Sequence, residues 1–493
     1  MVKVELNFDR RIYAFVAAYI LVSTLGMYYT PLFDEDEGFF AEAARQMLAS
    51  GDYVSISVNG EQRYDKPALF FWFTAISLKI FGLNELGARL PSYIFFLLSL
   101  FLMFRFVKRH FSDRIAFLSL VVAICMLQFQ VLSRAAVSDN LLNLLVSGAL
   151  FYFYDYSKSK SRMSLFWLYT LAGFGFITKG PLAFVIIFGV IFLFLLISKN
   201  FGLFRKTLNP LLIIWAVFIP FPWFYLAYLK SGDFLFTDFF IKHNLGRFSQ
   251  TMESHGGFWW YYFPVILLSF IPFGHLLFSG LRKIKIDDKN IFLMIWAALP
   301  FVLFSFSKTQ LPHYISIGYF PLIILISQTK NLNFNAIYIQ MTFMVLLFLL
   351  APTLIKHLEI KDVNVNLMLK KTSLIFDTKY IWIMLTMFVL INMLHFTKKQ
   401  TILGSLIIYS LAVSFFMYKY GLLQQGFVKE TGLKLRNSKT EIFMKDHYNP
   451  SLSFYARRVF NIKREFKKED KIFQKIEKKY PIKSTVIETK NGF

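Results

Sequence analysis

Long apolar stretches recur along most of this 493-residue chain and constrain its fold more than any other feature. They run for about 17–25 residues, which is close to the thickness of a bilayer at the helical rise of 1.5 Å per residue. Hydrophobic residues make up 56% of the sequence, and 61 residues are Phe. Because the core of a water-soluble protein does not need so many uniformly apolar segments, the sequence predicts an all-α polytopic membrane protein.

Positive charge lies mostly in short clusters between the apolar stretches and near the C-terminus. The formal net charge of +24 could also indicate a nucleic-acid-binding protein. The placement of the clusters instead fits the positive-inside rule and contact with membrane lipids, so we expect no nucleic-acid partner. The clusters expected on the cytoplasmic side, together with the N-terminus, are RFVKRHFSDR (105–114), SKSKSR (157–162), SKNFGLFRK (198–206), LRKIKIDDK (281–289) and TKKQ (397–400).

Placing the apolar stretches between these clusters gives about thirteen transmembrane helices. We interpret the first as an uncleaved span, because no small-residue cleavage site follows its apolar run. Cys125 is the only cysteine, which excludes a disulfide within the chain. The spans are expected near residues 11–30, 88–107, 114–132, 139–156, 163–178, 181–198, 209–228, 258–280, 290–306, 312–328, 335–355, 379–396 and 401–419.

The segment Pro67–Phe81 is apolar but short for a span, and counting it as one would move every later basic cluster to the outer side. We therefore expect a juxtamembrane helix here, within a first outer loop at 31–87. The same topology gives a second large outer loop at 229–257. It divides the chain into a transmembrane domain, 1–420, and a small outer α/β domain, 421–493, whose stretch YNPSLSFYARRVF mixes strand-like aromatic residues with turn residues.

Ionisable residues from distant segments meet on the outer side in this topology. Each has a simpler alternative reading: acids after a span are often a solvated face, Asp139 suits a helix N-cap, and Lys179 can extend to the interface. As a set, however, such groups tend to line a cavity and pair with one another. The set comprises PLFDEDEGFF (31–40), RYDKP (63–67), Asp139, Lys179, KHNLGRF (242–248) and SKTQLPHY (307–314).

The chemistry of this set points to a phosphate-bearing substrate. A carboxylate together with a His can hold a divalent ion. Lys and Arg together suit a phosphate, since Arg offers a planar fork and Lys a point charge. An outward-facing site of this kind within a lipid-accessible helical bundle predicts transfer from a lipid-linked phosphate donor.

The stretch DEGFFAEAARQMLASGDYVSISVNGEQRYDKPALFFWFTAISLKIFGLNELGARLPS (36–92) resembles the first-loop signature of the superfamily of bacterial aminoarabinose transferases and protein O-mannosyltransferases. Further similar blocks are SRAAVSDNLL, FITKGPLAF, KHNLGRF and SKTQLPHY, so the resemblance covers about residues 10–330. It implies a GT-C fold in the bacterial inner membrane, with a cytoplasmic N-terminus and with the active site and C-terminus in the periplasm.

Within this motif, Asp36 matches the catalytic carboxylate, with Glu37 beside it. In protein-directed members the acid would take the proton of the acceptor hydroxyl as the sugar transfers with inversion. A lipid A phosphate is already ionised near neutral pH, and Asp36 would then orient or bind it. A shift of the register by two residues would give the role to Asp34.

The resemblance also implies that Asp65 and His243 bind a divalent metal ion, with zinc as the expected ion, near the donor phosphate. The aminoarabinose transferases carry Glu at the position of Asp65, so the acid here is one methylene shorter.

Four further positions are expected at the donor phosphate or sugar: Lys66, Arg247, Lys179 and Tyr314. Lys66 and Arg247 would hold the undecaprenyl-phosphate oxygens and stabilise the leaving phosphate. The polar residues expected to line the same cavity are Asp139, Tyr64 and Lys308.

The expected function is therefore an inverting glycosyltransferase that moves a sugar from an undecaprenyl-phosphate donor to a periplasmic acceptor, with lipid A preferred. A protein O-mannosyltransferase-like enzyme is the alternative within the superfamily. From another class, the sequence leaves open a transporter or flippase for a lipid-linked substrate, with Asp139 and Lys179 on its path. The sequence does not name the sugar.

Overall fold

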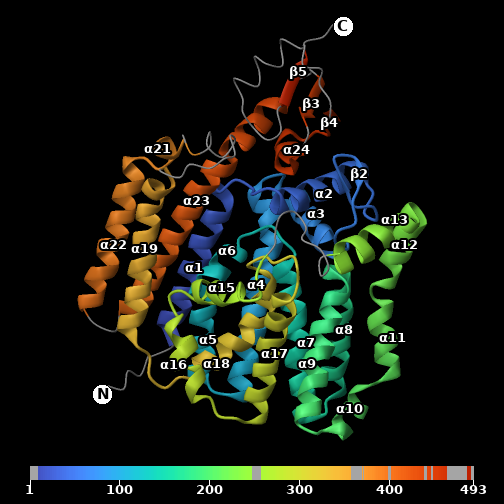
Figure 1. The fold of residues 1–493 in the computed structure, drawn as a ribbon, viewed down its shortest axis with the longest axis vertical. Helices are drawn as coiled ribbons and strands as arrows, with labels where there is room; N and C mark the ends of the chain where they lie inside the picture. Colours follow the sequence, from blue (N-terminus) through green and yellow to red (C-terminus); the bar gives the residue numbers. More distant parts are fainter. Residues whose placement is uncertain are drawn as a thin grey trace.

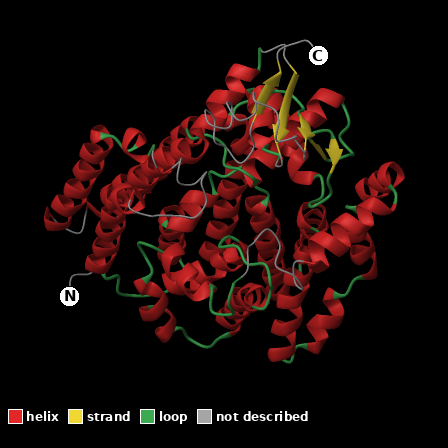
Figure 2. Ribbon diagram, turned by 45° about the horizontal axis from the view of Figure 1, so that its top comes forward, coloured by secondary structure: helices red, strands yellow, loops and turns green. Residues whose placement is uncertain are grey.

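The computed structural model of this chain describes residues 9–246, 257–356, 369, 371–397, 401–437, 441–445, 448–463 and 486–489. It consists of a large bundle of helices with a small sheet at one end (Figures 1 and 2). The bundle confirms the prediction of a polytopic α-helical protein, and its apolar core extends through most of its helices.

The N-terminal part of the bundle begins with one long helix and continues after the first loop. Its helices are α1 (Asp9–Tyr29), α4 (Glu85–His110), α5 (Asp113–Cys125), α6 (Leu127–Leu132), α7 (Asp139–Ser159), α8 (Arg162–Lys179), α9 (Pro181–Ile197), α10 (Phe201–Thr207), α11 (Pro210–Phe218) and α12 (Phe221–Ser231).

The C-terminal part adds shorter helices and then three long ones, α19, α22 and α23, which lie along one side of the bundle (Figure 1). The elements are α13 (Asp233–Leu235), η1 (Phe236–Leu245), α15 (Tyr262–Ser269), α16 (His275–Ser279), η2 (Leu281–Lys283), α17 (Asp288–Ser305), η3 (Tyr314–Gly318), α18 (Tyr319–Ser327), α19 (Phe334–Lys356), α21 (Thr372–Ile375), α22 (Thr378–Thr397) and α23 (Ile402–Leu435).

Each predicted span coincides with one helix or with two consecutive ones, but several are divided. The span expected at 258–280 consists of α15 and α16, because Pro272 and Gly274 interrupt it. The span expected at 209–228 breaks before Phe221, next to Pro220. By length and hydropathy, five described helices can cross a membrane, or six if the pair α10 and α11, bent by 50°, forms one span. The predicted count of about thirteen is therefore not established.

The first loop folds into two helices and a short strand pair. It contains α2 (Asp36–Ser50), a short antiparallel pair formed by β1 (Ser57–Val58) and β2 (Glu61–Gln62), and α3 (Leu69–Phe81). The helices α2 and α3 pack against each other, and both contact α4. The prediction of a surface helix at Pro67–Phe81 thus corresponds to α3.

The described part of the C-terminal segment forms a small α/β module, as predicted. Its sheet has the order β4-β3-β5, in which β3 (Glu441–Lys445) is parallel to β4 (Asn461–Lys463) and antiparallel to β5 (Val486–Thr489). Helix α23 continues past residue 421 to Leu435, so the predicted domain boundary lies inside this helix.

The module is joined to the first loop through α24 (Pro450–Ala456), which packs against both α2 and α23 (Figure 1). The buried Tyr455 hydroxyl accepts a hydrogen bond from the Leu32 backbone N–H at 2.8 Å and donates one to Glu85 Oε1 at 2.9 Å. Lys429 of α23 pairs with the same Glu85 carboxylate at 2.5 Å. These contacts fix the segment that leads into α2.

Candidate functional site

The start of α2 separates two adjacent acids into different environments. Asp36 and Glu37 stand in the first turn of α2, where acids interact favourably with the helix dipole. The helix ends at Gly51, which adopts the left-handed conformation with a φ of 72°. Because successive residues of an α-helix point about 100° apart, Asp36 and Glu37 cannot face the same way. Asp36 is exposed, whereas Glu37 is buried.

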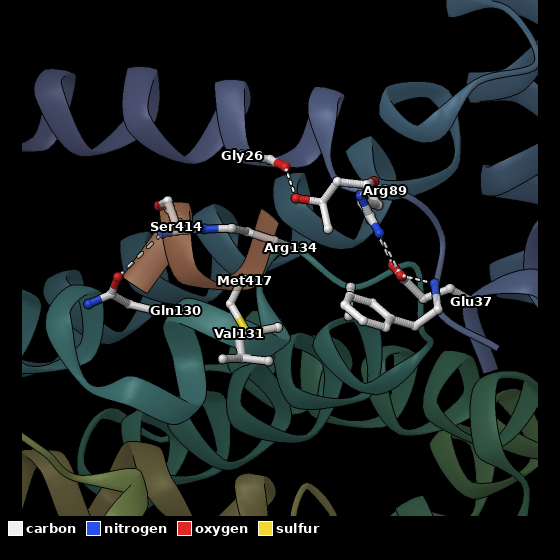
Figure 3. Close-up of a pocket in the computed structure, with 11 residues that line it drawn as sticks. Gly26, Glu37, Arg89, Gln130, Val131, Arg134, Ser414 and Met417 are labelled. Carbon is white, nitrogen blue, oxygen red and sulfur yellow. Dashed lines mark hydrogen bonds and ion pairs between the residues drawn. The ribbon is translucent and has the colours of Figure 1, made fainter. Parts of the chain in front are cut away.

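Glu37 is held by Arg89 of α4 in a buried, bidentate ion pair (Figure 3). Arg89 Nε donates to Oε1 at 2.8 Å and Nη2 donates to Oε2 at 2.6 Å. The same oxygens accept the backbone N–H groups of Ala136 at 2.6 Å and Phe33 at 2.9 Å. Both oxygens are thus occupied, so the geometry argues against the predicted catalytic role for Glu37. We infer that Glu37 positions the loop.

Asp36 forms no hydrogen bond or ion pair with any described residue, and its carboxylate is exposed. Asp36 is therefore an exposed carboxylate that no described side chain engages. Farther along the chain, His313 Nε2 lies 3.9 Å from Asp139 Oδ1.

Asp34, the alternative acid, is built into the joint with the C-terminal module. Its Oδ1 accepts the Ser451 backbone N–H at 3.0 Å. Burial, partly offset by the Ser451 hydrogen bonds, raises the pKa of Asp34 to about 6. These contacts favour Asp36 over Asp34 as the reactive acid.

A cavity of about 70 Å³ brings together five of the residues singled out in the sequence. Its walls come from the first loop, from the α8–α9 junction, from η1, and from the segment between α17 and η3. The lining residues are Asp65, Lys66, Lys179, Leu182, Phe239, His243, Phe304, Ser307, Tyr314 and Ile317.

Lys179 and Asp139 form an ion pair at the cavity. Lys179 Nζ lies 2.7 Å from Asp139 Oδ1 and 5.5 Å from the centre of the Tyr314 ring. Ser138, not Asp139, is the N-cap residue of α7, and the Lys179 side chain is mostly buried. The simpler alternatives, an N-cap role for Asp139 and a Lys179 side chain that extends to the interface, therefore do not apply.

Gly180 makes this arrangement possible. It has a φ of 67°, and a Cβ there would lie 2.5 Å from the Phe239 ring of η1. A larger residue would be strained in this conformation and would push η1 away from the end of α8.

Lys66 and Asp65 form a second charged group. Lys66 Nζ lies 3.4 Å from Asp65 Oδ2 and 4.9 Å from the centre of the Phe40 ring of α2. Arg63 Nη2 lies 3.9 Å from the same Asp65 oxygen. Two cations thus share one carboxylate, and the cavity has positive charge available for an anionic group.

His243 lies on η1, a π-helix, which places it opposite an acid five residues earlier. Its Nε2 is 3.4 Å from Asp238 Oδ1, and Asp238 Oδ2 accepts the Tyr64 backbone N–H at 2.9 Å. Burial raises the pKa of Asp238, but the hydrogen bonds from His243, Tyr64 and Lys242 outweigh that effect and hold it well below its ordinary value.

The predicted zinc site does not fit the described residues. Among them, no three His, Cys, Asp or Glu side chains are grouped closely enough to hold a metal ion. Protein zinc sites use three or four such ligands. Lys66 and Arg63 also compete with a metal ion for Asp65 Oδ2. No step of the reaction is therefore assigned to a metal ion.

Two predicted residues lie elsewhere, and a third cannot be placed against the cavity. Tyr64 is fully buried between Trp223 and Phe234 and does not line the cavity. Lys308 is exposed and is also outside the lining. Arg247 lies outside the described residues.

The sequence does not show which side chains pair with the predicted site residues. These partners are Arg63, Arg89, Asp238 and His313. Arg63, Arg89 and His313 lie in the quoted motifs, so their position was a usable signal. No such signal marked Asp238, since a spacing of five residues brings it next to His243 only in a π-helix.

Comparisons with known proteins find similar sequences and a similar fold. A family model described as dolichyl-phosphate-mannose-protein mannosyltransferase matches residues 65–225. The undecaprenyl phosphate-alpha-4-amino-4-deoxy-L-arabinose arabinosyl transferase of Aeromonas hydrophila is 31% identical over 306 residues, which cover 60% of this chain and 56% of that protein. The transferase of the same name from Wigglesworthia glossinidia brevipalpis is 28% identical over 463 residues, covering 88% and 80%.

The crystal structure of ArnT from Cupriavidus metallidurans bound to undecaprenyl phosphate superimposes with a TM-score of 0.79. The superposition covers 92% of this chain and 85% of ArnT at 22% sequence identity, so the two share a fold. The chain is thus similar to aminoarabinose arabinosyl transferases in sequence and to ArnT in fold. This similarity and the apolar helices together support a multi-pass protein of the bacterial inner membrane. The matched part spans just over half the length of several of these relatives.

Proposed function

We propose that this chain is an inverting glycosyltransferase that moves 4-amino-4-deoxy-L-arabinose from an undecaprenyl-phosphate donor to lipid A on the periplasmic face of the inner membrane. The names of its relatives support the sugar and the donor. The observation that carries the proposal is the cavity that gathers Lys66, Lys179 and Tyr314 next to the first loop, in which Asp36 is an exposed carboxylate.

The cavity suits the phosphate of the donor. In an inverting transfer, the acceptor oxygen forms a bond to the anomeric carbon while the bond from that carbon to the donor phosphate oxygen breaks. The electron pair stays on the departing phosphate. Lys66 and Lys179, both mostly shielded from water, would stabilise the charge that develops there. Their carboxylate partners keep them in place before the donor binds.

Asp36 would act on the acceptor. A phosphate acceptor is already ionised, so Asp36 would orient it or hold its counter-charge rather than remove a proton. A hydroxyl acceptor would instead give up its proton to Asp36. The exposure of Asp36 fits either role, since the acceptor must reach the site from outside.

A reconstitution assay tests the proposal. Purified protein in proteoliposomes would receive undecaprenyl-phosphate aminoarabinose and lipid A, and the modified lipid A would be measured by mass spectrometry. We expect wild-type protein to form product and Asp36→Asn to lose at least about 100-fold in rate, in line with the loss of a general base or an electrostatic group. Glu35→Gln is the matched control, because Glu35 is also an exposed acid of the same loop.

Two further arms separate the alternatives. A polyprenyl-phosphate mannose donor with a peptide acceptor would give product only for a protein mannosyltransferase. A flippase would move labelled donor lipid across the vesicle without forming product. Wild-type turnover in the Asp36→Asn variant would overturn the assignment of this residue.

A further inference from the structure

A second cavity, separate from the donor cavity, lies where α1 passes into the first loop (Figure 3). It has a volume of about 60 Å³ and is enclosed by α1, α6 and α23 together with the start of α2. It shares no lining residue with the donor cavity. Its most unusual wall residue is Arg134.

Arg134 is only 9% exposed. Its guanidinium donates from Nη1 to the Ser414 hydroxyl of α23 and from Nη2 to Gln130 Oε1 at 3.3 Å. Its Nε is buried and has no hydrogen-bond partner among the described residues. The contacts that it makes in the described part of the chain are to neutral groups, and no described Asp or Glu forms an ion pair with it.

The other charged residues of the cavity do not compensate this charge. Glu37 also lines the cavity, but both its oxygens are engaged by Arg89 and by backbone N–H groups. The pair of Glu37 and Arg89 has no net charge, so the Arg134 guanidinium remains as one uncompensated positive charge in the cavity wall. Buried charges in proteins are normally paired, because an isolated charge is costly to remove from water.

The cavity has the size of a small anionic group. A single water needs about 10–15 Å³ measured in this way, so the space holds roughly four to six heavy atoms, which is the size of a phosphate. The planar guanidinium favours phosphate or carboxylate over a point anion. Val131, Met417 and Phe33 supply apolar wall around it, which suits a phosphate carried on a lipid.

We propose that the cavity at Arg134 binds the phosphate group of an amphiphile, as a second anion site that shares no lining residue with the donor cavity. A lipid headgroup is the source that the apolar wall favours, and free phosphate is the alternative source of the same chemistry. Binding here does not depend on glycosyl transfer, so it stands or falls separately from the proposed reaction.

The test measures equilibrium binding of radiolabelled dioctanoyl phosphatidic acid to the full-length protein in a neutral detergent. We expect saturable binding to the wild type and an increase in Kd of at least about tenfold for Arg134→Gln, the loss typical of one charge-assisted contact. Arg162→Gln is the control, since Arg162 is an exposed arginine of α8. The Kd of this variant should equal that of the wild type. Dioctanoylglycerol, which lacks the phosphate, should not compete.

A second variant guards against misfolding of Arg134→Gln. Ser414→Asp would place a carboxylate where the hydroxyl now contacts Arg134, so it should neutralise the guanidinium inside the protein and weaken binding of the probe to a similar degree. Competition by inorganic phosphate at the same concentration as the lipid would identify free phosphate as the ligand. Equal affinity of the wild type, Arg134→Gln and Ser414→Asp, or no binding of either phosphate probe, would overturn the site.

Discussion

Arg89 and Glu37 form a two-point ion pair in which the side chains are only 2% and 4% exposed. The pair joins α4 to the start of α2, and Arg89 also donates to the backbone carbonyls of Met27 and Pro31 at the end of α1. The ion pair therefore holds the backbone of Asp36, the exposed acid next to Glu37, in place. This is how a buried residue can set the position of a reactive neighbour without touching the substrate.

Glu37→Gln should lower stability, whereas Asp36→Asn should not. The substitution leaves the Arg89 charge buried without its partner, which costs about 3–5 kcal/mol in comparable pairs. We expect a lower apparent Tm and less folded protein for Glu37→Gln in detergent, measured by tryptophan fluorescence. Asp36→Asn should keep the wild-type Tm while losing activity. Full stability of Glu37→Gln together with loss of activity would instead assign Glu37 to the chemistry.

Lys66 should matter for the donor, and Lys308 should not. Lys66 lines the cavity and is mostly shielded from water, while Lys308 is exposed and lies outside it. Replacing a cation that holds a phosphate removes a charge-assisted contact of about 1.5–3 kcal/mol. Lys66→Gln should therefore weaken binding of undecaprenyl phosphate by about 10- to 150-fold, measured with purified protein. Lys308→Gln should bind like the wild type, and equal losses in both variants would point to a general charge effect.

The sequence predicted the fold more completely than it predicted which side chains pair within the site. Apolar stretches and basic clusters located most of the long helices of the bundle to within a few residues, because these signals depend only on local composition. Helix α23 is an exception, since it continues to Leu435 although its span was predicted to end at residue 419. The first-loop motif located Lys66 and Asp65. The breaks at Pro220 and Pro272 were visible as prolines but were not used to divide the spans.

The pairing of Asp238 with His243 could not be predicted in the same way. An α-helix places residues four apart on one face, and that spacing joins Asp238 to Lys242. The π-helix η1 adds one residue to the turn and brings His243 to the same acid. The choice between Asp34 and Asp36 also required tertiary structure, since only the docking of α24 distinguishes them.

Removal of divalent metal should leave donor binding unchanged. The described residues provide Asp65 and His243 but no third ligand, and Asp65 is already shared by two cations. After treatment with a chelator, the Kd for undecaprenyl phosphate and the rate of transfer should equal those of untreated protein. Metal content would be checked by mass spectrometry of the same samples. Loss of activity that zinc restores, and that His243→Ala reproduces, would support the zinc site that the family resemblance implies.

The pH dependence of stability should report on Asp34. Its pKa is raised from 3.8 to about 6 because burial in the joint with α24 disfavours the charged form. The folded protein then holds this proton more tightly than the unfolded chain does. The resulting stabilisation is complete below pH 3.8 and is lost as the pH rises to about 6.

Asp34→Asn should remove this dependence, because the amide stays neutral and can still accept the Ser451 N–H. Between pH 5 and pH 7 the wild type should lose about 1.4 kcal/mol relative to the variant, since one pKa unit corresponds to that amount. The measurement is the apparent Tm of both proteins at the two pH values. Glu35→Gln controls for removal of a charge from the same loop and should keep the wild-type dependence. Parallel Tm curves for the wild type and Asp34→Asn would show that Asp34 is ionised throughout and that the joint tolerates its charge.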